Sequence, residues 1–197
     1  MKNPNAPLKG VKKTVQPIRK KKDIRSISRL LEDKPRDHLL FIMGINNGLR
    51  TGDLLKLKVK DVMHLKPGET IQIIESKTKK QNILMINKTV HKSLQNYLEK
   101  INPDEDAFLF SSRKGSAPLS VPSVNRLIKG WTSDINLQGR YGAHSLRKTW
   151  GFIQRTEHGT SFEVICKRYQ HSSPAITMRY LGVQAKEVKD ILLYEIG

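Results

Sequence analysis

Two short β-rich runs, TIQIIE (70–75) and NILMI (82–86), constrain the fold most, because most of the other apolar patterns in the chain have helical spacing. The segment between them, SKTKKQ (76–81), is polar and basic, which is typical of a hairpin turn. A two-stranded hairpin is at best marginally stable alone, so helices have to supply the rest of the core. The sequence therefore predicts a mainly α fold with one small antiparallel β-sheet, which is an α+β class.

Apolar residues at helical spacing predict helices along the rest of the chain. We expect a helix over 23–33 with Asp23 as its N-cap, and a buried helix over 37–47 that ends at Gly48. A short helix running into an extended piece is expected over 54–62, and a loop with a short strand at 108–110 is expected over 102–120. Further helices are expected over 89–99, 120–135, 144–156, 162–169 and 185–194, and one more opens at Pro174 with Ser173 as its N-cap.

The chain of 197 residues has the length of one domain with a tail. Residues 1–22 carry eight Lys and Arg, three Pro and no acid, and they cannot bury a core. We interpret them as a flexible basic arm that lies on a phosphate backbone, with a plain solubilising tail as the alternative. Residues 23–197 are expected to form one catalytic domain.

The charge balance favours a polyanionic partner. Lys and Arg number 36 against 18 Asp and Glu, which gives a net charge of +18. Nucleic acid fits this excess best, and an acidic membrane surface or a merely solvated basic face are the alternatives. Cys166 is the only cysteine, so an intrachain disulfide and a cysteine-based zinc site are excluded. The chain has no secretory signal and no apolar run long enough for a bilayer, which disfavours secretion and transport.

Four separated stretches carry polar groups suited to chemistry: NNGLRTGDLLKL with Arg50, the hairpin turn with Lys77, AHSLRKT with His144 and Arg147, and HSSPAITMRYLG with His171 and Tyr180. Each has an ordinary structural explanation when taken alone. A helix-terminal arginine can form a salt bridge, a turn lysine is usually only solvated, and a tyrosine on an amphipathic helix more often lies at the edge of a core.

Together these groups suit phosphoryl transfer. Two guanidiniums can clamp a phosphate through paired hydrogen bonds. Two imidazoles and an amine can move protons or donate to phosphate oxygens. A tyrosine is a weak nucleophile at its free pKa and needs such help. No cluster of acids or histidines is arranged as a metal site, so we expect side-chain cations to act in place of Mg²⁺, with no cofactor.

In this order the four stretches resemble the conserved boxes of the tyrosine recombinases, the family of the lambda-type phage integrases. NNGLRTGDLLKLKVKDV looks like the box of the first arginine, and SKTKKQNILMI looks like the β-hairpin lysine segment. AHSLRKTWG looks like the H-x-x-R box, and HSSPAITMRYLG looks like the last box, in which a His precedes the nucleophilic Tyr by nine residues.

The resemblance implies a role for each residue. Tyr180 would attack a DNA phosphodiester, forming a 3′-phosphotyrosyl bond and releasing a 5′-hydroxyl. Arg50 and Arg147 would stabilise the charge on the pentavalent phosphate. The other roles that the family implies are a base (His144), an acid for the leaving 5′-oxygen (Lys77), and a hydrogen bond to a non-bridging oxygen (His171). Asp53 would hold residues of the site in place without contacting the substrate. The alternative is that it is an exposed acid at the start of a helix.

The chain departs from the family pattern in two ways. The last box usually begins Leu-Gly-His, whereas here Tyr169 and Gln170 precede His171, so a larger residue replaces a small one where helices pack closely. Most integrases also carry a helical core-binding domain before the catalytic domain, and here only the basic arm precedes residue 23. The chain is then either a catalytic-domain fragment or one of the short recombinases, such as the fimbrial-switch invertases.

The expected partner is double-stranded DNA, bound by dimers or tetramers of the chain, and an accessory DNA-bending protein is a further candidate. Ile191 and Leu192 are candidates for docking on a neighbouring subunit, or for packing on the chain's own core. We expect a cytoplasmic, nucleoid-associated recombinase from a bacterium, an archaeon or a mobile element. The alternatives are a non-catalytic DNA-binding protein of this fold, a type IB topoisomerase-like relaxing enzyme and a basic RNA-binding protein.

Overall fold

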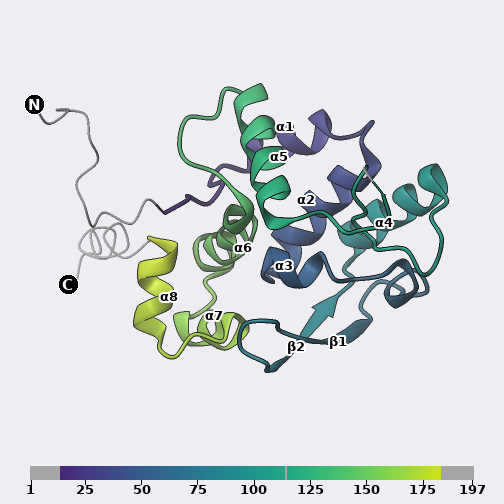
Figure 1. Ribbon diagram of the computed structural model, residues 1–197. Coiled ribbons are helices and arrows are strands. Elements are labelled where there is room, and N and C mark those ends of the chain that lie inside the picture. Colours follow the sequence, from purple (N-terminus) through teal and green to yellow (C-terminus); the bar gives the residue numbers. More distant parts are fainter. Residues whose placement is uncertain (1–13, 114, 183–197) are drawn as a thin grey trace, which may run out of the picture.

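Helices built from the periodic segments make up most of the fold, and one small hairpin packs on them, as the sequence predicts. The structure is a computed structural model, and it describes residues 14–113 and 115–182. The elements are α1 (Lys21–Leu30), α2 (Pro35–Asn47), α3 (Thr51–Leu54), the 3₁₀ turn η1 (Val59–Asp61), β1 (Thr70–Ile74), β2 (Gln81–Met85), α4 (Lys88–Ile101), α5 (Val121–Asp134), α6 (Ala143–His158), α7 (Phe162–Tyr169) and α8 (Pro174–Leu181). Figure 1 shows their arrangement.

Helix α2 is the centre of the core. It is buried almost all round, as expected for a helix that is apolar on every side, and it packs against both α4 and α6 (Figure 1). Gly44 lets α6 approach closely, because a Cβ there would lie 2.6 Å from Leu146 Cδ1. Gly48 ends α2 with a left-handed φ of 60°, as the sequence predicts. The residues that follow Gly48 are thereby directed across the start of α6.

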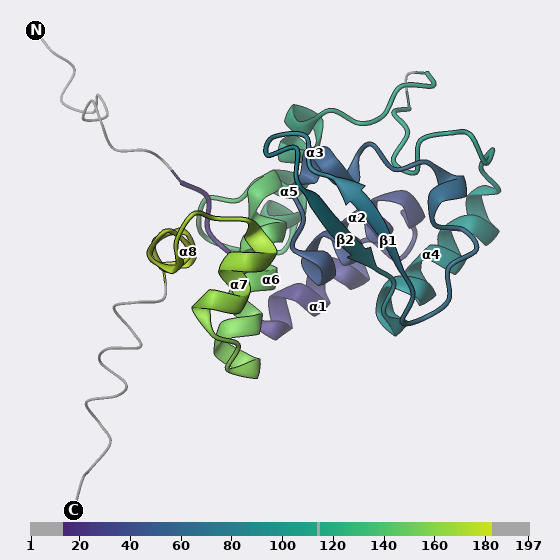
Figure 2. The ribbon, with the colours of Figure 1, turned by 90° about the horizontal axis from the view of Figure 1, so that it is seen from below.

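The hairpin forms as predicted. Strands β1 and β2 are antiparallel, with Thr70 opposite Met85 and Ile74 opposite Gln81. Figure 2 shows the two strands side by side, with α7 to the left of the pair and α4 to its right. Leu84 points into the main core, whereas Ile74 and Ile83 on the opposite face are 68% and 45% exposed. The hairpin is therefore held from one side only.

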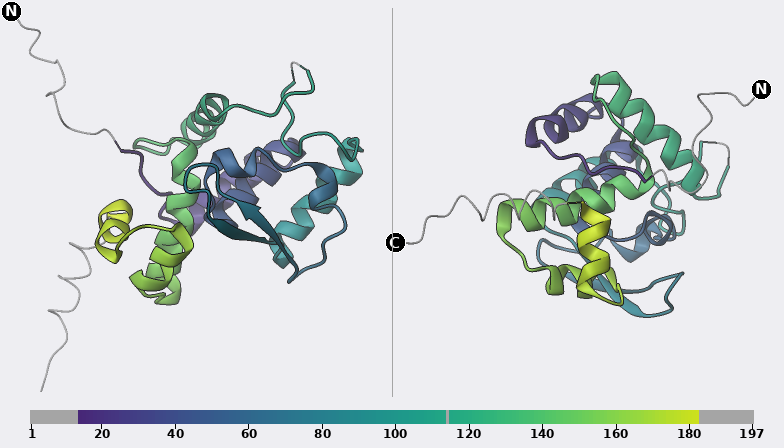
Figure 3. Two further views of the ribbon diagram at one scale, coloured as in Figure 1. Left: turned by 60° about the horizontal axis from the view of Figure 1, so that its bottom comes forward. Right: turned by 90° about the vertical axis from the view of Figure 1, so that its left-hand side faces the viewer.

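Helices α7 and α8 pack on α6 around a second, smaller core (Figure 3). Its buried residues are Phe162, Ile165, Tyr169 and Leu181. Ser173 occupies the N-cap position of α8 and Pro174 its first turn, as predicted. Leu181 anchors the end of α8 in this cluster, which fixes the neighbouring Tyr180 relative to α6 and α7.

The basic arm ends earlier than expected. Residues 14–20 run along the domain instead of extending away from it, and Ile18 is completely buried. The Ile18 amide donates to Thr149 Oγ1 on α6 at 2.8 Å, and the Gln16 amide donates to Arg140 O at 2.8 Å. The prediction of a flexible arm was wrong for these residues, because the many charges around Ile18 concealed an apolar anchor.

Three local expectations need correction. The short helix expected from residue 54 ends there instead, because α3 covers Thr51–Leu54, and the expected extended piece contains the 3₁₀ turn η1. Helix α1 begins at Lys21, so Asp23 lies in its first turn and Lys20 occupies the N-cap position. There the carboxylate still stabilises the helix through the dipole. The expected strand at 108–110 reduces to single bridges, of Lys58 with Phe108 and of Ser111 with Pro118. The helix expected over 185–194, with Ile191 and Leu192, lies outside the described residues. Within the described ranges, no helix is both long and apolar enough to cross a bilayer.

Candidate active site

Arg50 leaves the turn after α2 and forms an ion pair with Glu75, at the base of the hairpin turn. Glu75 is completely buried, and it also accepts hydrogen bonds from Thr78 Oγ1 and Asn82 Nδ2, both at 2.8 Å. Burial raises the pKa of Glu75, but these hydrogen bonds and the charge of Arg50 outweigh it, so the net shift is downward. An ionised carboxylate thus orients the Arg50 guanidinium.

Asp53 supports the same turn from α3. Its Oδ1 accepts from the backbone amide of Ser76 at 2.8 Å and from Ser76 Oγ at 2.6 Å. Asp53 is 5% exposed, so the alternative of an exposed helix-start acid was wrong. Lys77, the next residue after Ser76, is exposed at the turn, and its charge lowers the pKa of both His144 and His171. The turn therefore carries the ammonium within electrostatic range of both imidazoles.

Arg147 lies almost completely buried on α6 and joins the ends of two other helices. Its Nη1 donates to Gly48 O at 2.9 Å, and its Nη2 donates to Tyr169 O at 2.7 Å. The guanidinium carbon lies 4.3 Å from the centre of the Tyr169 ring. Burial and the neighbouring Arg50 lower the pKa of Arg147. Two carbonyls and one aromatic face thus hold this cation in a single orientation.

His144 lies in the first turn of α6, one residue after Ala143, whose amide donates to Asn125 Oδ1 at 2.6 Å. Partial enclosure by the protein, with the charges of Arg147 and Lys148, lowers the pKa of His144 below its usual 6.5. The imidazole is therefore largely neutral at pH 7, and it can accept a proton.

His171 follows α7 and is likewise neutral. Burial and the charges of Arg147 and Arg50 lower its pKa to about 4. Its Nδ1 lies 2.9 Å from Oγ1 of Thr177, a completely buried residue of α8. When the threonine hydroxyl donates to Nδ1, the imidazole proton resides on Nε2, which can then donate to a ligand.

Tyr180 on α8 points its hydroxyl into the protein. Its ring packs edge-on against His171 and Tyr169, with centroid distances of 5.4 and 5.5 Å, and Lys148 Nζ lies 4.6 Å from its centroid. The hydroxyl is buried and makes no hydrogen bond of good geometry within the described residues, although the Arg147 guanidinium lies near enough to interact with it. Burial raises the pKa of Tyr180, and Arg147 and Arg50 oppose that rise. A buried hydroxyl without a well-formed hydrogen bond is costly, which marks this group as unusual.

The structure thus brings the six predicted side chains into one electrostatic neighbourhood. The charges of Arg50 and Arg147 act on His144, His171 and Tyr180 alike. His144 and Tyr180 also line one pocket of about 450 Å³ between α6 and α8. Such a group of fixed cations, two neutral imidazoles and a phenol can bind an oxyanion and stabilise charge that develops on it.

Several residues that hold the predicted side chains in place were not predicted from the sequence. They are Glu75, Asn125, Arg168 and Thr177, each of which contacts or orients a predicted side chain or its segment. Of these four, only Glu75 could have been noticed in the sequence, because it is an acid at the end of an apolar strand, directly before a basic turn. The Gln170 side chain, expected to disturb packing, points at the hairpin instead, where its Nε2 donates to Gln81 O at 2.8 Å.

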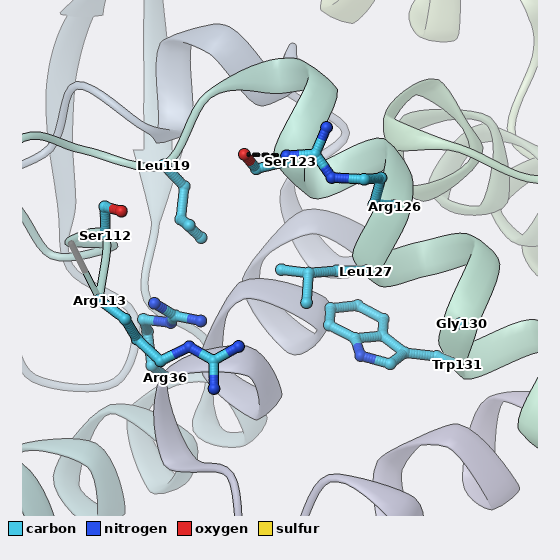
Figure 4. A pocket seen from close by; sticks show the side chains of 9 residues that line it. All are labelled: Arg36, Ser112, Arg113, Leu119, Ser123, Arg126, Leu127, Gly130 and Trp131. Atoms are coloured by element: carbon cyan, nitrogen blue, oxygen red, sulfur yellow. Dashed lines mark hydrogen bonds between the residues drawn. The ribbon is translucent and has the colours of Figure 1, made fainter.

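A second basic hollow of about 540 Å³ lies beside α5 (Figure 4). None of the six predicted side chains lines it; its lining includes Arg36, Arg113, Arg126, Leu119, Leu127 and Trp131. Arg36 is bonded to Asp37 and to Ser111 O, and Arg126 donates to Ser123 Oγ at 3.0 Å. Two of its three arginines thus already bind within the protein, which makes it a weaker candidate for chemistry.

Known proteins share the sequence pattern and the fold of this chain. The model of the phage integrase family matches residues 18–187. The probable integrase/recombinase YoeC of Bacillus subtilis is 37% identical over 172 residues, which cover 86% of this chain and 90% of YoeC. The tyrosine recombinase XerA of Pyrococcus furiosus is 28% identical over 192 residues, which cover 96% of this chain and 64% of XerA.

The fold recurs in the crystal structure of the XerH site-specific recombinase bound to its difH substrate, a pre-cleavage complex. The TM-score is 0.63 at 22% identity, over 87% of this chain and 50% of XerH. The chain thus spans about half of XerH and somewhat less than two thirds of XerA. Because the family model covers most of the sequence and YoeC is similar over nearly its whole length, the chain belongs to the phage integrase family of tyrosine recombinases.

Proposed function

We propose that this chain is an active site-specific recombinase that cleaves and rejoins DNA through Tyr180. The observation that carries the proposal is the buried Tyr180 hydroxyl, which makes no well-formed hydrogen bond and lies in the field of Arg147 and Arg50. A phosphodiester bound by these two guanidiniums would meet that hydroxyl. A packing role for the ring alone would not explain why its hydroxyl is buried without a well-formed hydrogen bond.

The proposed cleavage exchanges one phosphodiester for another. Tyr180 Oη attacks the phosphorus, the bond from phosphorus to the 5′-oxygen breaks, and a 3′-phosphotyrosyl bond forms. Attack by a 5′-hydroxyl on that bond reverses the step and restores Tyr180. The number of phosphodiester bonds is unchanged throughout, so we expect the reaction to need neither ATP nor a metal ion.

The proton of Tyr180 passes to His144, and Lys77 supplies a proton to the leaving 5′-oxygen. The lowered pKa of His144 keeps its imidazole free to accept a proton. A bound phosphodiester would offset part of the cationic field that depresses this pKa, so the imidazole becomes a stronger base when substrate is present.

Arg50, Arg147 and His171 stabilise the pentavalent phosphate. Both guanidiniums are held by contacts on their protein side, Arg50 by Glu75 and Arg147 by two carbonyls. Preorganised donors of this kind lower the barrier because they need no rearrangement as charge develops. His171 donates from Nε2 while Thr177 holds its Nδ1.

Replacing Thr177 by Val tests the role of this hydroxyl. Losing one hydrogen bond of about 1–1.5 kcal/mol should release the tautomer of His171 and slow single-turnover cleavage roughly five- to tenfold. Nitrogen NMR of the imidazole should report a changed mixture of tautomers. Thr132→Val is the matched control, because the equally buried Thr132 hydroxyl binds only carbonyls of its own helix. An unchanged His171 spectrum in Thr177→Val would contradict this assignment.

The proposed partner is double-stranded DNA, bound by dimers or tetramers in the cytoplasm, with an accessory DNA-bending protein as a further candidate. The excess of basic residues and the DNA-bound state of XerH support the DNA partner. Since phosphates dominate such binding, affinity should fall steeply with salt, with a log–log slope of about −6 for about seven neutralised phosphates.

The experiment is covalent trapping. The chain is incubated with fragmented genomic DNA in the presence of EDTA and denatured, and the protein-linked DNA is sequenced. An adduct that maps to a few loci supports the proposal and identifies the target. An adduct spread evenly over the DNA would point to a relaxing enzyme, and tight duplex binding without an adduct would favour a binding protein.

A further inference from the structure

Helix α7 ends in an unusual backbone conformation at Gln170. The residue occupies the C-cap position with φ 52° and ψ 41°, in the left-handed region that favours glycine. Gln has a Cβ, and its side chain cannot offset this conformation with the local hydrogen bonds that Asn forms. A benefit elsewhere is therefore expected to compensate for this backbone strain.

The Gln170 side chain bridges the gap from α7 to the hairpin turn. Its Nε2 donates to Gln81 O at 2.8 Å, and its Oε1 accepts from Thr78 Oγ1 at 2.9 Å. Thr78 lies within the turn, directly after Ser76 and Lys77, and Gln81 begins the strand that follows it. The single proton of the Thr78 hydroxyl is also within reach of Glu75 Oε2, at 2.8 Å. A continuous chain of polar contacts thus runs from Gln170 through Thr78 and Glu75 to Arg50.

Arg168 holds β2, the strand that follows the turn. Arg168, two residues before Gln170, donates from Nη1 to Asn82 Oδ1 at 2.7 Å and to Ile83 O at 2.8 Å. Its Nε and Nη2 donate to Asn47 O, at 2.9 and 2.6 Å. One end of α7 therefore holds both the hairpin and the end of α2.

Lys77 needs this support more than the other predicted side chains do. Within the described part of the chain, it has no hydrogen bond or ion pair, and the outer face of the hairpin is open to solvent, with Ile74 68% exposed. A two-stranded hairpin is marginally stable without packing partners. The position of the Lys77 ammonium therefore depends on whatever holds the turn.

We propose that Gln170 is a positioning residue for Lys77: it latches the hairpin turn to the end of α7, next to His171, so that the ammonium faces the leaving 5′-oxygen. The part that concerns the leaving oxygen rests on the proposed function. The latch itself is a property of the folded protein, and it is tested separately.

The first arm of the experiment needs no DNA. In Gln170→Gly the left-handed backbone is retained without strain and the side-chain contacts are lost. Amide hydrogen exchange at Ser76, Lys79 and Glu75 should accelerate at least several-fold, because closing the turn no longer gains the latch contacts. Asn102→Gly is the matched control, since Asn102 is an exposed left-handed C-cap residue of α4. In Asn102→Gly the exchange rates of the turn amides should equal those of the unmodified chain. If the rates in Gln170→Gly also equal those of the unmodified chain, Gln170 does not latch the turn.

The second arm compares two substrates made from the trapped target DNA, one with the normal 5′-oxygen at the scissile position and one with sulfur there. Sulfur leaves as a thiolate and needs no proton, so its departure does not require Lys77. We expect Gln170→Gly to slow cleavage of the oxygen substrate about 10- to 100-fold, the size of effect that misplacing a catalytic group by about 1 Å can have. On the sulfur substrate its rate should stay within about threefold of the unmodified chain.

Lys77→Ala should show the same pattern, and the double variant should lose little more than Lys77→Ala alone, because both changes remove one function. Equal losses on oxygen and sulfur, or fully additive losses in the double variant, would overturn the positioning role. If the unmodified chain forms no adduct with either substrate, the proposed function fails, and the exchange arm still decides whether Gln170 latches the turn.

Discussion

Tyr180→Phe is expected to abolish the covalent adduct with DNA while leaving the fold and duplex binding intact. The ring packs against Tyr169 and His171 through contacts that Phe retains. The deleted hydroxyl makes no well-formed hydrogen bond within the described residues, and Arg147 keeps both of its carbonyl acceptors, so loss of the hydroxyl leaves no buried group unsatisfied. The free energy of unfolding of Tyr180→Phe, measured by thermal unfolding, should therefore equal that of the unmodified chain or exceed it by up to about 1 kcal/mol. Removing a buried, hydrogen-bonded group usually lowers it.

The matched control is Tyr97→Phe, which changes a buried tyrosine on α4. This variant should form the adduct at the unmodified rate. Adduct formation is read from denaturing gels, and duplex affinity from a titration at fixed salt. Persistence of the adduct in Tyr180→Phe would show that another residue is the nucleophile, and a clear loss of stability would show that the hydroxyl has a structural partner.

Arg147→Lys is expected to reduce cleavage by about 10²- to 10³-fold and to destabilise the protein by about 1–3 kcal/mol. The guanidinium donates to Gly48 O and Tyr169 O at once, through two nitrogens at a fixed angle. A lysine amine cannot reproduce this planar fork, so one buried carbonyl loses its donor. The same change would also remove the paired donation to the phosphate that we propose, which separates this variant from a merely structural one.

Arg168→Lys provides the comparison, because Arg168 also donates to a carbonyl at the end of α2, Asn47 O. We expect a similar loss of stability in a denaturant titration. Its cleavage defect should be smaller than that of Arg147→Lys and should recover on the sulfur substrate, since Arg168 acts through the hairpin. If both variants lose the same activity on both substrates, Arg147 has no special relation to the phosphate.

The elements could be predicted because periodicity carries that information. The hairpin, the end of α2 at Gly48 and the bounds of α7 all follow from such patterns. The six candidate side chains were chosen from four motifs and from the family resemblance of those motifs, and their roles stay a prediction. The packing of residues 14–20 could not be predicted, since Ile18 is one apolar residue among many charges and its burial depends on α6.

The contacts that support the candidate site could not be predicted from the sequence, for a related reason. Glu75, Thr177 and Gln170 act across distances of 25, 6 and 89–92 residues in sequence, and composition does not reveal which partner each will meet. Gln170 illustrates this best. Its size predicted disturbed packing, but a left-handed backbone turns its side chain towards the hairpin.

Mass spectrometry of the trapped complex tests the central claim most directly. The denatured adduct is digested with a nuclease and a protease, and the modified peptide is fragmented to locate the attached nucleotide. The account predicts a nucleotide joined through its 3′-phosphate to Tyr180, with a free 5′-hydroxyl on the other DNA end. A nucleotide on another residue, such as Tyr169, or a linkage through a 5′-phosphate would contradict it.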